Sequence, residues 1–318
     1  MNNIGIIGNE DRPQVRETLV LLLTKLADRF PGSTIALSEP MAALSDSRDC
    51  QVFASHYDLA RFSDIIFSIG GDGTMLMASR AIQRANHKAE LIGVNVGKLG
   101  FLSEHPPEEL DQLLEELSGG TLLAEQRLML HAAVRSERGD SVTINRDNLD
   151  LSREGTQQPK VTLDALNEVV VDNYGSTRML QLEVFVGSAL LGIIRADGIM
   201  VATPTGSTGY AVSAGGPIVE PTSPVMLITP IAPHSLNVRP IIVSQEATIR
   251  IRCASDETSQ VLIVADGQEQ IIASTPAEII VQAAPNPLKL LRRRERSYFD
   301  LLRTKLFWSA DRRDVGRR

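Results

Sequence analysis

The sequence has little of what marks a disulfide-stabilised or metal-binding protein. Only two of its 318 residues are cysteines, Cys50 and Cys253, and they are far apart and form no Cys-x-x-Cys pattern. This content favours a reducing compartment and argues against a disulfide framework. The five histidines show no ligand spacing either. We therefore expect no histidine or cysteine metal site.

Long apolar runs and an excess of positive charge are also missing. The run at residues 19–23 is far too short to cross a bilayer, and the first residues lack the regions of a signal peptide. The formal net charge of −7 argues against broad binding to nucleic acid or to an anionic membrane. We expect a cytoplasmic enzyme. Basic residues near the C-terminus are interpreted as a solvated helix face and a frayed tail; they are Arg292, Arg293, Arg294, Arg296 and those in residues 312–318.

Residues 1–127 alternate strand and helix patterns, which predicts an α/β domain. Strands separated by helices pair in parallel through right-handed crossovers, so we expect a parallel sheet with crossover helices. Apolar residues at helical spacing and short buried runs define the elements. The predicted strands are residues 4–7, 35–37, 52–53, 65–69 and 91–96, and the predicted helices are residues 14–29, 74–85 and 108–117.

Residues 128–295 have a different character, with β-branched and apolar runs separated by turn residues. They predict a mainly antiparallel β-sandwich domain, with a helix only after Gly206. Polar residues 136–160 are expected to form a long exposed hairpin loop, and the C-terminal segment 296–318, with a helix at 297–308, to pack back on the first domain. The predicted strands are residues 128–134, 161–171, 179–186, 189–195, 199–202, 225–229, 248–252, 261–264 and 278–281.

The sharpest motif is Gly70-Gly71-Asp72-Gly73-Thr74, at the end of a predicted buried strand and the start of a predicted helix. Glycine lets phosphate oxygens approach the backbone amides, and the helix adds its positive N-terminal end. A carboxylate among phosphates suits two tasks: accepting a proton from an attacking hydroxyl, or holding a magnesium ion. The structural alternative is a tight turn in which Asp72 caps the following helix. The motif points to a phosphotransferase.

Other segments add polar groups at strand ends. Residues 203–210 and 213–217 are rich in hydroxyls and glycines that could bind sugar or phosphate oxygens. Asn167 and Glu168 interrupt a buried strand, at a desolvation cost unless they have partners. Residues 195–198 and 265–268 could be simple strand-end turns. The chain contains neither a Gly-x4-Gly-Lys-Ser/Thr loop nor a Gly-x-Gly-x-x-Gly loop, so neither of those nucleotide folds is supported.

Together these segments resemble the NAD kinase family. The resemblance covers residues 70–76, 95–102, 166–171, 197–217, 233–240 and 297–299. It implies transfer of a phosphoryl group from ATP, or another donor such as polyphosphate, to the 2′-hydroxyl of the adenosine ribose of NAD, giving NADP. Asp72 matches the proposed base of the family and Gly73 its partner in the phosphate loop. The positions that match the dinucleotide site are Asn167, Glu168, Arg178, Arg195, Asp197, Thr208, Gly209, Tyr210, Ala211, Val212, Ser213 and Gln268.

The resemblance also implies a homodimer or homotetramer in which the β domain of one subunit completes the site of its neighbour, with Mg²⁺ arriving on the nucleotide donor. The sequence departs from the family pattern at Met77, where many relatives carry Arg or His, and at Ala196 and Gly209, where Ser and Ala are usual. Two alternatives remain open. A lipid kinase of the same superfamily would need a broad apolar cleft, and a nucleotide-binding regulator would have lost turnover.

Overall fold

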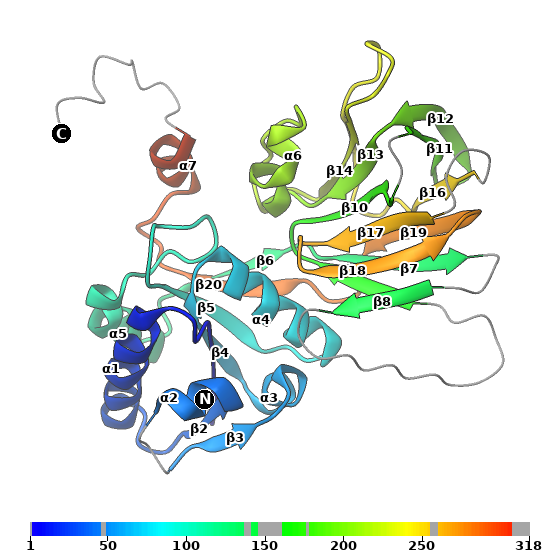
Figure 1. Ribbon diagram of the computed structural model, residues 1–318. Coiled ribbons are helices and arrows are strands. Elements are labelled where there is room, and N and C mark those ends of the chain that lie inside the picture. The colour runs from blue at the N-terminus through cyan, green and yellow to red at the C-terminus, as the bar shows by residue number, and fades with distance from the viewer. Residues whose placement is uncertain are drawn as a thin grey trace. The chain divides into compact units, whose positions relative to one another are not determined.

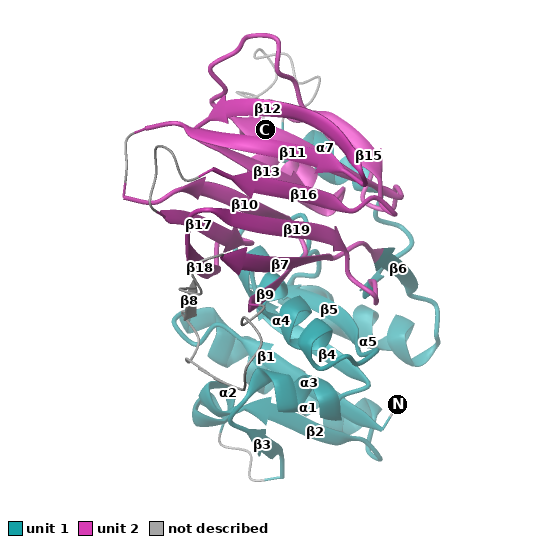
Figure 2. Ribbon diagram, turned by 90° about the vertical axis from the view of Figure 1, so that its right-hand side faces the viewer, with its two compact units in different colours: residues 1–126, 288–318 teal, residues 127–287 magenta. Residues whose placement is uncertain are grey.

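The computed structural model describes residues 2–45, 49–136, 141–145, 161–175, 178–254 and 260–306 (Figure 1). The chain divides into two compact units (Figure 2). Unit 1 consists of residues 1–126 together with 288–318, and unit 2 consists of residues 127–287. Within the described ranges, no helix combines the length and the apolar character needed to cross a membrane.

Unit 1 is an α/β unit, as the sequence predicted. Among the described residues its sheet has seven strands in the order β3-β2-β1-β4-β5-β20-β6. Strands β1 to β5 pair in parallel with their neighbours, and β20 pairs in parallel with β5. The strands are β1 Asn3–Gly8, β2 Thr34–Ser38, β3 Gln51–Phe53, β4 Ile65–Gly70, β5 Glu90–Asn95, β6 Leu123–Arg127 and β20 Leu288–Arg292.

The helices of unit 1 follow the strands along the chain. The long helix α1 begins at a proline, which favours the first helical position, and its buried face is made of Val15, Leu19, Leu22 and Leu26. Two short helices, α2 and α3, were not predicted because six or seven residues carry little periodic signal. The helices are α1 Pro13–Arg29, α2 Glu39–Leu44, α3 His56–Phe62, α4 Asp72–Arg84, the 3₁₀ turn η1 Pro107–Glu109, α5 Leu110–Ser118 and α7 Tyr298–Leu306.

The interpretation of the C-terminal arginines as a solvated helix face is wrong for Arg292 and Arg293. Arg292 is the last residue of β20, and the two side chains are 5% and 7% exposed. Arg292 pairs with Glu104 at 2.7 Å and with Glu125 at 2.9 Å, and Arg293 pairs with Glu116 at 2.9 Å. These carboxylates neutralise the buried guanidinium groups. The residues from 312 onward lie outside the described part of the chain.

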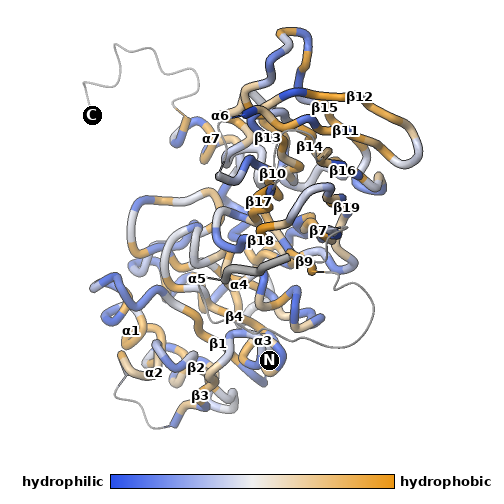
Figure 3. Tube along the Cα trace, turned by 45° about the vertical axis from the view of Figure 1, so that its right-hand side comes forward, coloured by the Kyte–Doolittle hydropathy of each residue, from blue (hydrophilic) through white to orange (hydrophobic). Residues whose placement is uncertain are grey.

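Unit 2 is the predicted antiparallel sandwich. In the described part of the chain, a seven-stranded sheet has the order β15-β14-β13-β10-β17-β18-β8, and a six-stranded sheet has the order β12-β11-β16-β19-β7-β9. One core contains buried residues of both sheets, such as Val171 and Ile263 from the first and Leu182 and Ile251 from the second. Figure 3 shows hydrophobic residues along β17 in this core.

The strand bounds of unit 2 correct two predictions. The predicted single strand at 161–171 is two strands, β9 and β10, which belong to different sheets. The predicted loop at 136–160 is wrong at Ser136, which ends β7, and at residues 141–145, which form β8 against β18; residues 137–140 and 146–160 lie outside the described ranges. The strands are β7 Leu130–Ser136, β8 Ser141–Asn145, β9 Val161–Ala165, β10 Glu168–Asn173, β11 Leu180–Val186, β12 Ala189–Ala196, β13 Gly198–Ala202, β14 Val225–Ile231, β15 Ile241–Ser244, β16 Ile249–Cys253, β17 Gln260–Ala265, β18 Glu269–Ser274 and β19 Ala277–Ala283.

Candidate functional site

The glycine-rich motif joins the carboxyl end of β4 to the first turn of α4. Gly71 is the N-cap of α4, and Asp72 is its first residue. Gly70 has no room for a side chain, because an added methyl carbon would lie 2.2 Å from Oγ1 of Thr74. Gly73 is exposed and Asp72 is half-buried. The motif therefore presents backbone and one carboxylate at the edge of the sheet where open α/β folds bind ligands.

The Asp72 carboxylate does not cap α4, contrary to the structural alternative. Its oxygens accept hydrogen bonds from a loop about thirty positions further along the chain. The Phe101 amide donates to Oδ2 at 2.8 Å, and the amides of Leu102 and Ser103 donate to Oδ1 at 3.1 Å each. The Ser103 hydroxyl adds a fourth donor to Oδ1 at 3.2 Å. The carboxylate is therefore held in one orientation by fixed backbone groups.

Arg12 is a candidate that the sequence analysis missed. It follows the carboxyl end of β1 and is the exposed N-cap residue of α1. A methyl group added at Gly71 would lie 3.8 Å from both terminal nitrogens of Arg12, and one added at Gly97 would lie 2.9 Å from one of them. A cation thus stands beside the glycine-rich loop. Its position just after the first parallel strand was the signal that could have revealed it.

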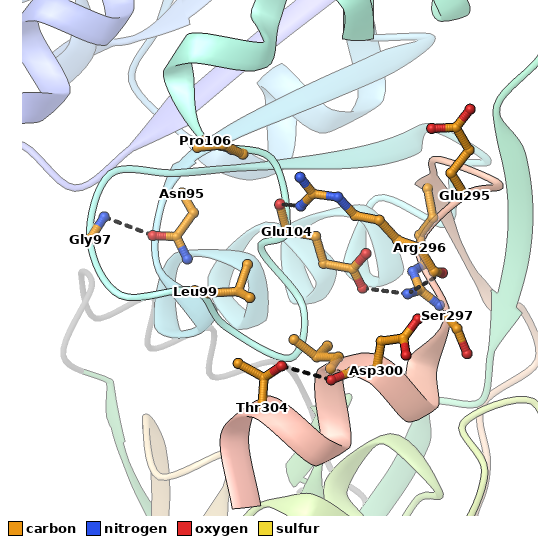
Figure 4. Close-up of a pocket in the computed structure, with 12 residues that line it drawn as sticks. Asn95, Gly97, Leu99, Glu104, Pro106, Glu295, Arg296, Ser297, Asp300 and Thr304 are labelled. Carbon is orange, nitrogen blue, oxygen red and sulfur yellow. Dashed lines mark hydrogen bonds and ion pairs between the residues drawn. The ribbon is translucent and has the colours of Figure 1, made fainter. Parts of the chain in front are cut away.

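A cavity of about 430 Å³ opens in unit 1 beside the same loop (Figure 4). Its wall includes Asn95 and Gly97, whose hydrogen bond is drawn in Figure 4, and Glu104, Arg296 and Asp300. The volume is in the range of small-molecule sites, about 300–1,000 Å³. In the part of the chain that the structure describes, no three His, Cys, Asp or Glu side chains gather closely enough to hold a metal ion.

In unit 2, a tight turn between β9 and β10 carries Asn167 and Glu168. The Asp266 carboxylate accepts from the amide of Leu166 at 3.0 Å, of Asn167 at 2.7 Å and of Glu168 at 3.2 Å. Asp266 is 6% exposed and adopts a positive φ of 52°. The segment 265–268 is therefore more than a strand-end turn, because it fastens the turn that carries two candidate binding residues.

The segment 203–210 packs against the same turn. The Thr203 hydroxyl donates to the Leu166 carbonyl, and the Thr203 amide donates to the Asn167 carbonyl at 2.8 Å. A methyl group added at Gly206 would lie 2.1 Å from that carbonyl oxygen, so only glycine fits there. The segment forms η2 Thr205–Thr208 and the short helix α6 Tyr210–Ser213.

The surroundings of Glu168 perturb its carboxyl group. It is 7% exposed, and burial together with the nearby charge of Asp266 raises its pKa to about 7. The backbone amide of Tyr210 partly opposes this by hydrogen bonding to the carboxylate. A methyl group added at Gly209 would lie 3.2 Å from Oε2 of Glu168, so the glycine found there leaves space beside the carboxylate.

The predicted residues of unit 2 fall into two groups. Asn167, Glu168 and Gln268 lie around Asp266, and the segment from Thr208 to Ser213 lies next to Glu168; in that segment Ala211 is buried and Tyr210 is exposed. Arg178, Arg195 and Asp197 are exposed at the other end of the strands, since Glu168 pairs with Ala202 whereas Asp172 pairs with Gly198. Four steps along a strand separate the ends by roughly 13 Å. Within one chain, the structure does not bring these two groups together.

Comparisons with known proteins identify the family of the chain. Residues 4–122 match the family model of the ATP-NAD kinase N-terminal domain, and residues 166–293 match that of the ATP-NAD kinase C-terminal domain. An NAD kinase of Pseudomonas syringae pv. syringae is 35% identical over 308 residues, which cover 97% of this chain and 96% of that protein. The chain belongs to the NAD kinase family. An NAD kinase of Halorhodospira halophila is 36% identical and covers 96% of this chain and 93% of its own length.

Two solved structures share the fold. Yeast NADH kinase in complex with NADH has a TM-score of 0.85 and 23% identity, covering 98% of this chain and 89% of that one. An NAD kinase from Archaeoglobus fulgidus in complex with ATP has a TM-score of 0.66 and 23% identity, covering 96% and 98%. The resemblance inferred from the motifs is confirmed by the family models and by the relatives at 35–36% identity.

Proposed function

We propose that the protein transfers the terminal phosphoryl group of ATP to the 2′-hydroxyl of the adenosine ribose of NAD, giving NADP, and that Asp72 acts as the base. Asp72 is assigned as the base because its carboxylate lies in the glycine-rich loop, at the first residue of α4, and is held there by the Phe101 amide. The chain also belongs to the NAD kinase family. The chain has only two cysteines, which lie far apart in the sequence; this favours a reducing compartment, and we propose the cytoplasm.

Unit 1 supplies the groups for the donor phosphates. The amides that begin α4 carry partial positive charge, and the glycines leave them open to phosphate oxygens. Arg12 adds a full charge beside Gly71. We propose that Mg²⁺ comes with the donor; when bound, it would neutralise charge on the transferred group.

Unit 2 supplies the groups for the dinucleotide. The Asn167 amide can both donate to and accept from sugar hydroxyls, and Glu168 offers a carboxyl group in a partly desolvated site. Three backbone amides of the Leu166–Glu168 turn donate hydrogen bonds to the Asp266 carboxylate. They hold the turn that carries Asn167 and Glu168 in place before a ligand arrives. Preorganised donors and acceptors lose little freedom on binding, which favours affinity for a ribose.

The proposed step is an in-line displacement. The ribose 2′-oxygen forms a bond to the terminal phosphorus while the bond from that phosphorus to the bridging oxygen of ADP breaks. In a loose transition state the attacking oxygen needs little advance activation. Asp72 therefore aligns the hydroxyl and takes its proton late, as the new bond forms. Proton transfer of this kind typically contributes about 10²–10⁴ in rate.

We propose that a second subunit completes the dinucleotide site. Support comes from the position of Arg178, Arg195 and Asp197 at the end of the strands opposite Glu168. The edge strand β12 also exposes two apolar side chains, Leu190 at 53% and Ile193 at 59%. An exposed apolar edge favours pairing with another chain. A homodimer or homotetramer through unit 2 would cover it.

The test follows labelled phosphate from the γ-position of ATP into NAD, with sphingosine and diacylglycerol as alternative acceptors. We expect label in NADP alone, and transfer to either lipid would replace the proposal with a lipid kinase. Asp72→Ala should reduce turnover by at least about a hundredfold while calorimetry finds near-normal NAD affinity. Asp72→Asn is a less clean variant, because its NH₂ group would face one of the amide donors that now bond to the carboxylate. Turnover near that of the unmodified protein in Asp72→Ala would remove Asp72 from catalysis.

A further inference from the structure

The geometry points to Ser103 and Asn95 as positioning residues that determine which oxygen of Asp72 receives the substrate proton. This inference rests on the proposed function, because it assumes that Asp72 is the base. Both residues belong to unit 1, and they are 0% and 4% exposed, respectively. Neither needs to touch a substrate for the argument to hold. They act through the carboxylate and through the loop of residues 97–103.

The two oxygens of Asp72 are not equivalent. Within the described residues, Oδ1 accepts from the Leu102 amide, the Ser103 amide and the Ser103 hydroxyl, at 3.1–3.2 Å. Oδ2 accepts only from the Phe101 amide, at 2.8 Å. A carboxylate oxygen has about two lone-pair sites, so Oδ1 is saturated whereas Oδ2 keeps one site for a further donor. An incoming ribose hydroxyl can therefore bond to Oδ2.

Asn95 determines the direction of the Ser103 hydroxyl. Its Nδ2 donates to the Ser103 hydroxyl oxygen at 3.0 Å, and also contacts the carbonyls of Ser103 at 3.0 Å and Lys98 at 2.9 Å. Its Oδ1 accepts from the Gly97 amide at 2.7 Å, which fixes the orientation of the side-chain amide. Because the Ser103 oxygen already accepts from Asn95, its single proton is free to point at Asp72 Oδ1. The order of donation is Asn95 to Ser103 to Asp72.

The network is anchored in the sheet. Asn95 is the last residue of β5 and pairs with Gly70, which precedes the glycine-rich turn. The Asn95 amide donates to the His105 carbonyl at 2.7 Å, and the Gly100 amide donates to the Ser103 carbonyl at 3.2 Å. A methyl group added at Gly100 would lie 1.8 Å from Asp72 Oδ1, so the loop can approach the carboxylate only with glycine there. The hydrogen bonds thus connect the carboxyl end of β5 to Asp72 through Ser103.

The chemical consequence concerns one proton. In the proposed step the ribose oxygen bonds to phosphorus, the bridging oxygen leaves with ADP, and the ribose proton moves to Asp72 Oδ2. With Oδ1 held by three donors, the carboxylate cannot rotate to offer the other oxygen. Loss of the Ser103 hydroxyl leaves the amides of Leu102 and Ser103 bonded to Oδ1 but holds the Asp72 carboxylate less firmly in its orientation. Such a change affects turnover rather than the binding of NAD.

The first experiment compares Ser103→Ala with Ser63→Ala as the matched control. Ser63 is also fully buried in unit 1, and its hydroxyl donates to the Leu59 carbonyl at 2.7 Å, away from the loop. We expect Ser103→Ala to lower kcat by about tenfold or more, with KM for NAD changed by less than about twofold. Ser63→Ala should leave kcat unchanged, and Ser103→Thr, which keeps the hydroxyl, should restore most of it. An unchanged kcat in a folded Ser103→Ala protein overturns the inference.

A double-mutant cycle separates positioning from general structural damage. In an Asp72→Ala background, Ser103→Ala should change the residual rate by less than about twofold, because the group through which it acts is gone. A further tenfold loss in that background would show that Ser103 acts independently of Asp72, and would overturn the inference. Full turnover in Asp72→Ala alone is a different outcome: it contradicts the proposed base itself. The two failures are therefore distinguishable.

Discussion

At the scale of single residues, each unit contains a carboxylate that is fastened by three successive backbone amides. Asp72 accepts from the amides of residues 101–103, and Asp266 accepts from those of residues 166–168. Backbone amides cannot rotate away as side chains do, so both carboxylates hold a loop and are held by it. In unit 1 the carboxylate is itself the reactive group. In unit 2 it fixes the neighbours Asn167 and Glu168, which are the candidate ligand-binding residues.

Glu168 gives a prediction about pH. Its pKa is raised to about 7, so the folded state holds a proton that the unfolded state releases near its ordinary value. The stabilising contribution of Glu168 is therefore present below that ordinary value and is lost as pH rises through about 7. We expect the thermal midpoint of Glu168→Gln to fall less than that of the unmodified protein between pH about 5 and about 8.

Calorimetry across this range is the measurement, and Glu246→Gln, which alters an exposed acid in the same unit, is the control. The thermal midpoint of the control should equal that of the unmodified protein at every pH. Titration with NAD adds a second readout, because Glu168→Ala should weaken NAD binding about tenfold or more if the carboxyl group bonds a sugar hydroxyl. If the thermal midpoints of Glu168→Gln and of the unmodified protein change equally with pH, the raised pKa of Glu168 is contradicted.

At the scale of elements, β20 completes the sheet of unit 1 with a segment from near the C-terminus. It is contributed by residues 288–292, lies between β5 and β6, and pairs in parallel with β5. Its last residue, Arg292, makes buried ion pairs with Glu104 and Glu125. Removing one partner of a buried pair leaves an uncompensated charge, which is costly even where the intact pair contributes little net stability.

We therefore expect Arg292→Ala to destabilise unit 1 by about 3–5 kcal/mol. Arg303→Ala is the matched control in the same unit, because its ion pair with Asp300 is on the surface, with the Arg303 side chain 65% exposed. The control should change stability by less than about 1 kcal/mol. The free energy of unfolding of both variants is measured by urea unfolding, with hydrogen exchange in unit 1 as the probe. Equal effects of the two substitutions would mean that the buried pairs are not what secures β20.

At the scale of the whole molecule, the separation of the predicted dinucleotide residues makes assembly testable. If Asp197 serves a neighbouring subunit, a subunit with Asp72→Ala and one with Asp197→Ala should complement each other. Each variant alone should be nearly inactive, whereas mixed oligomers should regain about a quarter to a half of the activity, since they contain sites with both residues intact. Activity assays on refolded mixtures, with light scattering for size, make the measurement.

The exposed edge of β12 provides the second arm of this prediction. Ile193→Asp should shift the protein towards smaller species and lower its activity on dilution, because a charge at an apolar interface disfavours association. Val52→Asp is the control, since Val52 is 54% exposed on the edge strand β3 of unit 1. A fully active monomer, or mixtures with no regained activity, would contradict a shared site.

Local patterns in the sequence were sufficient to predict much of the secondary structure and the glycine-rich loop of this protein. Spacing of apolar residues determined the alternation of strands and helices in residues 1–127 and the β-rich character of the rest, because periods of two and 3.6 residues follow from backbone geometry alone. The glycine-rich turn at Gly70–Thr74 could also be recognised in the sequence, because few residues other than glycine let a ligand approach the backbone at a helix N-terminus so closely. Family resemblance added the reaction, which no local pattern specifies.

The tertiary structure decided which distant groups meet. The partners of Asp72 lie about thirty positions away and those of Asp266 about one hundred, and the carboxylates that neutralise Arg292 lie more than one hundred and sixty positions before it. The run at 161–171 became two strands because Asp266 and Thr203 fasten a turn in its middle. Such pairings depend on which strand edges and loops lie together, and their free energy comes from burial and hydrogen bonds that do not exist until the chain has folded.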